Sequence, residues 1–147
     1  MSRLFGRAAV FVGMIEDFPY PENRVLLNPQ DPEILTFEYT YRKELLARRK
    51  RFRKALLRAF RGHRRFMVSL QPMLNFGHPT GTLRFGTDPT RSVLRPDCRT
   101  HDLDNLYVAD AAFMPSALGV NPSLTIAANA LRVADIIAGR VQGRASP

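Results

Sequence analysis

Two polar stretches of the chain hold the residues whose types and order suit chemistry. The first reads Gly-His-Pro-Thr-Gly-Thr-Leu-Arg-Phe-Gly-Thr-Asp-Pro over residues 77–89. The second runs from Asn-Leu-Tyr-Val-Ala-Asp-Ala at 105–111 to Gly-Val-Asn-Pro-Ser-Leu-Thr-Ile at 119–126. An imidazole can remove a proton at neutral pH, and a side-chain amide can stabilise negative charge that develops on oxygen. The two stretches therefore combine side chains that proton transfer requires.

Several common phosphate-binding and nucleophile motifs are absent from the sequence. The glycines stand at positions 6, 13, 62, 77, 81, 86, 119, 139 and 143, so no two of them have the G-x-G spacing. The sequence therefore contains no Rossmann phosphate loop, and no G-x-x-x-x-G-K-[ST] Walker loop occurs in it either. A G-x-S-x-G nucleophile elbow is missing as well.

Cys98 and His101 have half of the spacing of a zinc knuckle. A structural zinc site needs four ligands, and only His63 and His78 remain as imidazoles, neither in a paired motif. The sequence therefore predicts no metal site, and Cys98 is interpreted as a small packing residue. Because it is the single cysteine of the chain, an internal disulfide is excluded.

The order of the motifs resembles that of one protein family. His-Pro-x-Gly-Thr and Gly-Thr-Asp-Pro are followed by Asn-Leu-Tyr-Val-Ala-Asp-Ala and then by Gly-Val-Asn-Pro-x-Leu-Thr-Ile. In this arrangement the chain resembles the C-terminal segment of the glucose–methanol–choline (GMC) family of flavoprotein oxidoreductases. A weaker match at Pro21-Glu22-Asn23-Arg24-Val25 extends the resemblance to about residues 16–139, which is most of the chain.

The resemblance implies that a small-molecule alcohol, as a CH–OH donor, is oxidised to a carbonyl while a hydride passes to FAD. Family members place a histidine, and a second histidine or an asparagine, at the face of the flavin. Matched to this sequence, these residues are His78 as the base and Asn121 as its polar partner. The competing interpretations are structural, with His78 as a turn residue satisfied by backbone groups and Asn121 as a helix N-cap.

The resemblance also implies contacts with the cofactor. A helix that begins near Pro122 has free N–H groups and a partial positive charge at its N-terminus, which suit an anionic group. By resemblance, backbone groups of Asn121, Pro122 and Ser123 contact the pyrimidine side of the flavin. Asp110 and Ala111 would contact the ribityl or pyrophosphate portion of FAD. The alternative for Asp110 is a turn carboxylate that closes a strand.

The expected fold class is α+β, as the C-terminal fragment of a two-domain FAD-binding oxidoreductase. Residues 1–100 are expected to form the end of an antiparallel-sheet substrate domain, with a basic helix at 42–61 and an active-site loop at 75–100. Residues 101–139 are expected to form the C-terminal part of the FAD-binding domain, including its last strand and helix. Residues 140–147 are expected to be a disordered tail.

The Rossmann unit that holds the adenosine half of FAD in the family has no counterpart in this sequence. The chain is therefore expected to be an incomplete enzyme that is inactive alone. A separate N-terminal half carrying the Rossmann unit is one expected protein partner, and a misplaced start of the sequence is the alternative that needs no such partner. A non-catalytic remnant that unfolds without cooperativity is an alternative interpretation.

Short strands and two helices are expected to position the site residues. β-branched, aromatic and apolar runs bounded by turn residues predict strands at 10–14, 24–27, 34–41, 66–70 and 106–109. The C-terminal helix is expected to have Asn121 as its N-cap and Pro122 as its first residue, and to end at Gly139.

The net charge of +9 comes from one segment of the chain. Twelve of the 22 Lys and Arg residues fall between Arg42 and Arg65, where Glu44 is the only acid. Apolar residues recur there with the 3.6-residue period of an amphipathic helix, at Leu45, Phe52, Leu56 and Phe60. The basic side is interpreted as a solvated face, and nucleic-acid binding through residues 42–65 is the alternative function.

Length and composition limit the remaining classes of protein. With 147 residues, 45% hydrophobic and 24% charged, the chain is typical of a globular protein. No apolar run reaches the ~20 residues that a transmembrane helix needs, so no membrane partner is expected. The absence of a targeting signal predicts a cytoplasmic location.

Overall fold

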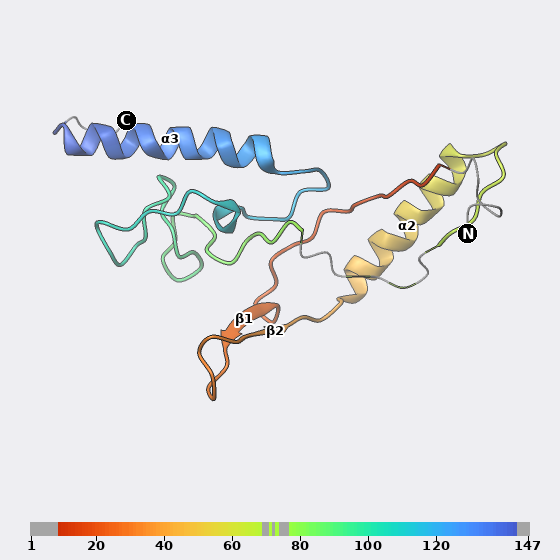
Figure 1. Cartoon of the computed structure of the whole chain (residues 1–147), viewed down its shortest axis with the longest axis horizontal. Coiled ribbons are helices and arrows are strands. Elements are labelled where there is room, and N and C mark those ends of the chain that lie inside the picture. The colour runs from red at the N-terminus through yellow and green to blue at the C-terminus, as the bar shows by residue number, and fades with distance from the viewer. Residues whose placement is uncertain (1–8, 69–70, 72, 74–76, 144–147) are drawn as a thin grey trace.

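The computed structural model describes residues 9–68, 71, 73 and 77–143. Its regular elements are strands β1 (Arg24–Leu27) and β2 (Leu35–Glu38), helices α2 (Lys43–Ala59) and α3 (Ser123–Val141), and the 3-10 helix η1 (Ala111–Phe113). The described chain is thus a small α+β structure with one antiparallel sheet of two strands. Figure 1 shows α2 and α3 in different parts of the molecule, with the irregular chain before α3 folded alongside that helix.

Strands β1 and β2 form a hairpin. Arg24 lies opposite Glu38, and Leu27 lies opposite Leu35. Every residue of both strands is exposed, although most of them are apolar. A two-stranded hairpin is at best marginally stable in water without packing on another element. The hairpin therefore has no core of its own.

Helix α2 has the amphipathic pattern that its sequence predicts. Leu45 is its buried residue, and Phe52 lies so close to the N-terminal segment that a Cβ at Gly13 would be 2.5 Å from its ring. The Phe11 and Phe60 rings also meet, with their centroids 4.6 Å apart. The N-terminal segment therefore covers part of the apolar side of α2.

Some predicted strands are wrong. The segment 10–14 packs on α2 and pairs with no other described strand. The predicted strand at 66–70 has no regular structure over residues 66–68, and its residues 69–70 lie outside the described part of the chain. Within the segment 106–109, Tyr107 forms only an isolated bridge to Arg99. A strand needs a neighbour for its backbone hydrogen bonds, and among the described residues these segments have none of sufficient length.

The largest buried cluster lies between α3 and the irregular chain before it. Leu94, Cys98, Phe113, Met114 and Val133 form this cluster, and Leu94 and Cys98 are completely buried. Cys98 thus packs in the core, as its sequence context predicts. This cluster fixes α3 against the segments that carry the predicted site residues.

Polar contacts hold α3 in the same place. Arg132 donates hydrogen bonds to the carbonyl oxygen of Pro96 at 3.0 Å and to the sulfur of Cys98 at 3.2 Å. The buried amide of Asn129 contacts that sulfur as well, at 3.6 Å. Because these contacts come from one side of α3, they also set the rotation of the helix about its axis.

The N-terminal segment connects the part around α2 to the part around α3. Asp17 and Ala117 exchange two backbone hydrogen bonds of 3.1 and 2.9 Å. Next to them, the Ser116 hydroxyl donates to the Glu16 carboxylate at 2.6 Å. These contacts join residues that are 100 positions apart in the sequence.

The ends of α3 differ from the prediction. The helix begins at Ser123, with Pro122 as its N-cap, so the assignment of the N-cap to Asn121 is wrong by one position. Gly139 lies inside the helix, and Gly143, with φ of +67°, follows its end. The first residues of the expected tail, 140–141, are therefore helical, and 144–147 lie outside the described residues.

Candidate active site

The loop that carries His78 is held against η1 by backbone hydrogen bonds. The N–H groups of residues 81, 83 and 85 donate to the carbonyl oxygens of residues 111, 112 and 113, at 3.4, 3.0 and 3.2 Å. Gly81 has φ of +78°, and a Cβ there would lie 3.3 Å from the carbonyl oxygen of Met114. The loop thus needs a glycine at this position to approach η1 so closely.

Asp110 begins η1. Its Oδ1 atom accepts a hydrogen bond of 2.8 Å from the N–H of Ala112, which makes Asp110 the N-cap. This carboxylate therefore has a structural role that agrees with the turn interpretation. A cofactor contact through the other carboxylate oxygen is compatible with the cap.

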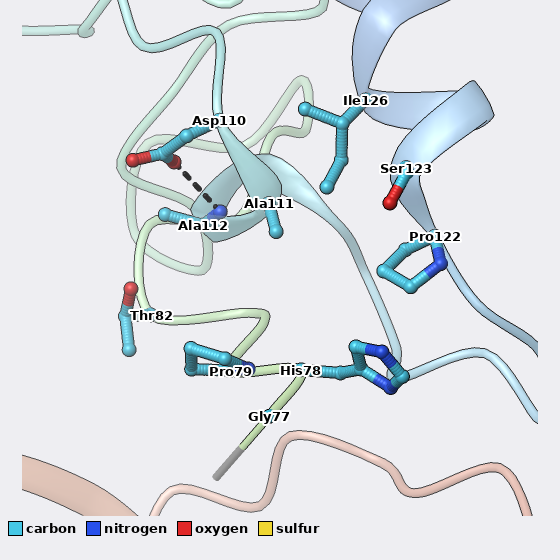
Figure 2. A pocket seen from close by; sticks show the side chains of 10 residues that line it. All are labelled: Gly77, His78, Pro79, Thr82, Asp110, Ala111, Ala112, Pro122, Ser123 and Ile126. Carbon is cyan, nitrogen blue, oxygen red and sulfur yellow. Dashed lines mark hydrogen bonds between the residues drawn. The ribbon is translucent and has the colours of Figure 1, made fainter.

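A pocket of about 400 Å³ lies where the His78 loop, η1 and the start of α3 meet. Figure 2 shows side chains from all three segments around it, with the His78 ring on the side of Pro122. Most of the lining is apolar, and the polar side chains are His78, Thr82, Asp110 and Ser123. An apolar cavity with a few convergent polar groups is the usual form of a small-molecule site.

The N-terminus of α3 forms one wall of this pocket. Pro122 is buried, Ser123 is the first helical residue, and both line the pocket. The first turn contains no acidic residue, so no carboxylate offsets the partial positive charge at this end of the 19-residue helix. The wall therefore favours a bound group that carries or gains negative charge.

The Gly-Thr-Asp-Pro motif forms a turn beside the site. The hydroxyl and the N–H of Thr90 both donate to Asp88, which lowers the pKa of that carboxyl group. The Ser92 hydroxyl donates to the Asp88 carbonyl oxygen and lies 3.1 Å from Nε2 of His101. Asp88 and His101 thus organise a loop and do not line the pocket.

The structure brings together most of the predicted site residues. His78, Asp110, Ala111, Pro122 and Ser123 all line the pocket. Asn121 is exposed and is not among the lining residues, although it precedes Pro122 directly. The structure therefore groups five of the six predicted residues, and their chemical roles remain predictions.

The pocket also contains residues that the sequence reasoning did not select. They are Gly77, Pro79, Thr82, Ala112 and Ile126. Three of them neighbour His78 within the same motif, and that proximity could have identified them. Ile126 follows Ser123 by three positions, which is the spacing of one helical face, so helix geometry was the available signal.

Cys98 and His101 do not form a metal site. Cys98 contacts Asn129 and Arg132, and His101 contacts Ser92. Within the described part of the chain, no group of three or more His, Cys, Asp or Glu side chains is close enough to hold a metal ion. Similarly, none of the described helices has the length and apolar character to cross a membrane.

The residues of the pocket fit one end of a flavin. Its small apolar residues leave room for a planar ring, and the N-terminus of α3 suits the negative charge that a flavin gains on reduction. The sequence has no phosphate loop for the adenosine end, since no two of its glycines have the G-x-G spacing.

Comparisons with known proteins agree with this arrangement. The chain is 48% identical over 64 residues to 6'''-hydroxyparomomycin C oxidase of Streptomyces lividus, and 48% identical over 67 residues to paromamine 6'-oxidase of Streptomyces fradiae. These matches cover 44% and 46% of this chain but only 12% of each relative. The chain thus spans about one eighth of the length of these relatives.

A solved structure is similar over more of the chain. The crystal structure of pyridoxine 4-oxidase from Mesorbium loti matches with a TM-score of 0.58 and 29% sequence identity, over 77% of this chain and 26% of that chain. The family model described as GMC oxidoreductase, for the C-terminal region, matches residues 19–130. The chain therefore belongs to the GMC oxidoreductase family and corresponds to a C-terminal part of its fold.

Proposed function

We propose that this chain supplies the flavin-facing part of the active site in an FAD-dependent oxidoreductase that converts a CH–OH group to a carbonyl. One observation carries the proposal: His78 and the N-terminus of α3, which are more than 40 residues apart in sequence, line the same pocket. GMC oxidoreductases are FAD-dependent, and the relatives include alcohol oxidases. The specific alcohol is a small molecule that fits against the open side of this pocket.

His78 is the proposed general base. Oxidation of a CH–OH group removes a proton from the hydroxyl oxygen and a hydride from the carbon, and a C=O bond forms. The half-buried imidazole of His78 lines the pocket and takes the hydroxyl proton. FAD, when bound, supplies the acceptor for the hydride.

The start of α3 is the proposed site of negative-charge stabilisation. The backbone N–H groups of Ser123, Leu124 and Thr125 lack intrahelical acceptors, because they belong to the first turn of the helix. Asn121 and Pro122 complete this part of the site, with Asn121 as the polar partner that orients the substrate oxygen. Asn121 is exposed and directly precedes Pro122, which lines the pocket.

Asp110 and Ala111 are the proposed contacts for the ribityl or pyrophosphate portion of FAD. One carboxylate oxygen of Asp110 accepts a hydrogen bond from the N–H of Ala112. The other oxygen would accept a hydrogen bond from the cofactor. The Rossmann unit for the adenosine end is proposed to come from a separate N-terminal half. The isolated chain is then expected to bind a flavin weakly and to be inactive.

A titration of the isolated chain with lumiflavin, which has the ring system without the adenosine end, tests the pocket. We expect FMN, which keeps the ribityl chain and one phosphate, to bind with an affinity similar to that of FAD, because the sequence has no G-x-G loop for the adenosine end. Ala111→Leu fills the pocket and should weaken lumiflavin binding on the order of tenfold, which corresponds to about 1.4 kcal/mol. Binding is measured by the change in flavin fluorescence.

The matched control makes the same substitution on the outside of α3. Ala128 is exposed and does not line the pocket, so Ala128→Leu should leave lumiflavin affinity unchanged. Equal loss in both variants would argue against this pocket as the site. Much tighter binding of FAD than of FMN would contradict the proposed division of the cofactor site.

A further inference from the structure

Helix α2 carries a row of basic side chains on the side opposite the one that the N-terminal segment covers. Lys43, Lys50, Lys54 and Arg58 are all exposed, and they follow one another at spacings of seven, four and four residues. Residues at these spacings lie on one side of a helix. The row runs along most of α2, and its ends are about 22 Å apart along the helix axis. We call it the basic strip.

The two sides of α2 differ in how their cations are compensated. On the inward side, Arg48 pairs with Glu44 and donates to the carbonyl oxygen of Glu16. Among the described residues, by contrast, no ion pair includes a member of the basic strip. Glu44 is the only acid between Arg42 and Arg65, so the sequence places no second carboxylate near the strip. The outward side is therefore a row of uncompensated positive charge.

This row of charge does not stabilise the helix. Lys50, Lys54 and Arg58 are successive neighbours at a spacing of four, where like charges destabilise a helix. Lys43 is the first residue of α2, where a cation also opposes the positive end of the helix dipole. A solvated helix face usually carries charges of both signs, whereas a block of basic residues is typical of a surface that binds nucleic acid. The basic strip therefore fits a partner of opposite charge.

We propose that the basic strip binds the phosphate backbone of duplex DNA, with α2 lying in the major groove. Over about 22 Å, B-form DNA presents roughly a dozen phosphate charges, one per ~1.7 Å of its axis. Its major groove is wide enough to admit an α-helix. Arg51 and Arg53 are exposed and lie on opposite flanks of the strip. A helix in the groove would thus present cations to the phosphates on both sides.

Features of α2 argue against other polyanions. A helix that binds a membrane surface inserts its apolar side into the lipid. On α2 that side is already covered, because Leu45 is buried and a Cβ at Gly13 would lie 2.5 Å from the Phe52 ring. Single-stranded nucleic acids stack their bases on aromatic side chains, and the basic strip has none. The major groove of an RNA duplex is too narrow for side chains to read. Duplex DNA is thus the polyanion that this helix fits.

The proposed DNA surface is separate from the candidate active site. None of the residues that line the described pocket belongs to α2, and Figure 1 shows α2 and α3 in different parts of the molecule. DNA binding is therefore a second function, and it does not rest on the proposed oxidation of an alcohol. A variant that loses DNA binding should keep its affinity for lumiflavin, so the two proposals are tested independently.

Fluorescence anisotropy with a short labelled DNA duplex tests the proposal on the full 147-residue chain. We expect a Kd of roughly 1–100 µM at physiological salt, the range of binding that depends on phosphate contacts alone. The logarithm of the affinity should fall against the logarithm of the salt concentration with a slope of about −4, because four cations of the strip displace counterions. An affinity that does not respond to salt would overturn the proposal.

Substitutions on α2 locate the contact. Lys50→Gln together with Lys54→Gln should weaken binding on the order of tenfold and reduce the salt slope by about 2, because each lysine on a phosphate contributes about 1. The matched control is Arg91→Gln together with Arg95→Gln, which removes the same charge from exposed residues outside α2 and should bind like the unchanged chain. Equal loss in both double variants, or in neither, would contradict the assignment. Circular dichroism of each variant checks that α2 is intact.

Thiol labelling gives a second measurement that removes no charge. Cys98 is completely buried, so an introduced cysteine is the main reactive thiol. Ala47 is exposed between Lys43 and Lys50, and labelling of Ala47→Cys should slow on the order of tenfold at a duplex concentration of about ten times Kd. Labelling of Ala128→Cys, at an exposed position of α3, should not change. Equal protection of both cysteines would overturn the proposal. So would binding of an RNA duplex, a single strand or anionic phospholipid vesicles that is as tight as binding of the DNA duplex.

Discussion

His78 and Asp110 both stand in recognisable motifs, and both line the pocket, but their surroundings differ. The Asp110 carboxylate already accepts a hydrogen bond from the N–H of Ala112. His78 lies in a loop whose later residues donate backbone hydrogen bonds to the carbonyl oxygens of η1. The order of the motifs was sufficient to select these residues from sequence. Thr82 and Ile126 could not be selected in the same way, because only the folding of three segments together brings them to the pocket.

Replacement of the proposed base provides a test at the residue scale. In a chimera of pyridoxine 4-oxidase whose matching segment is replaced by this chain, His78→Gln should lower turnover of an alcohol on the order of 100-fold or more, because glutamine cannot take the hydroxyl proton. Lumiflavin should still bind, since glutamine keeps a polar side chain of similar reach. Steady-state kinetics with pyridoxine as the alcohol, the substrate named for the oxidase, measures the effect. Unchanged turnover would remove His78 from the mechanism.

Substitution of Asp110 separates its capping role from any cofactor contact. Asp110→Ala removes the acceptor for the N–H of Ala112 and should destabilise the chain by about 1 kcal/mol, the usual cost of losing an N-cap. Asp110→Asn keeps an oxygen at that position and should retain most of the stability. Urea unfolding of the two variants measures the difference. Equal destabilisation by alanine and asparagine would show that the carboxylate charge matters more than the cap.

At the scale of the elements, helices were predicted better than strands. The apolar period identified α2, and the turn residues identified β1 and β2, because these signals lie within the element itself. The segments 10–14 and 106–109 have the composition of strands, but a strand also requires a neighbour that the sequence of one segment does not supply. The end of α3 was misplaced because Gly139 is tolerated within the helix and Gly143 provides the left-handed residue after it.

The contact between Tyr39 and Asp17 joins the end of the hairpin to the N-terminal segment. The Tyr39 hydroxyl donates to the Asp17 carboxylate, and burial together with this hydrogen bond raises the pKa of Tyr39. Because the folded state favours the protonated phenol, this contribution is present below pH ~10, the ordinary pKa of tyrosine. It is lost as the pH rises from there toward the raised pKa of the folded state.

In Tyr39→Phe the free energy of unfolding should be lower near neutral pH, because the hydrogen bond to Asp17 is lost. It should also fall less steeply at alkaline pH, because the variant has no phenol to ionise at this position. Unfolding in urea at a series of pH values from neutral to strongly alkaline measures both effects. Tyr41→Phe is the matched control, since the two rings pack edge to face with centroids 5.2 Å apart. If the free energy of unfolding of Tyr39→Phe fell with alkaline pH as steeply as that of the unchanged chain, the role of this phenol would be contradicted.

At the scale of the whole molecule, the positive charge is partly engaged within the chain. Arg42 pairs with Glu22 and lies over the Tyr20 ring, and Arg48 donates to the carbonyl oxygen of Glu16 and lies over the Phe18 ring. These contacts hold α2 to the N-terminal segment. They give these two arginines a structural role, and binding of nucleic acid through residues 42–65 stays a prediction.

The distribution of burial predicts how the isolated chain unfolds. Apart from Leu45 on α2, the fully buried apolar residues belong to the cluster around α3, and the hairpin is exposed on both faces. A cooperative domain of this length would have an unfolding enthalpy of roughly 100 kcal/mol near 60 °C. We expect calorimetry of the isolated chain to give a clearly smaller value and a broad transition, because few contacts couple its parts.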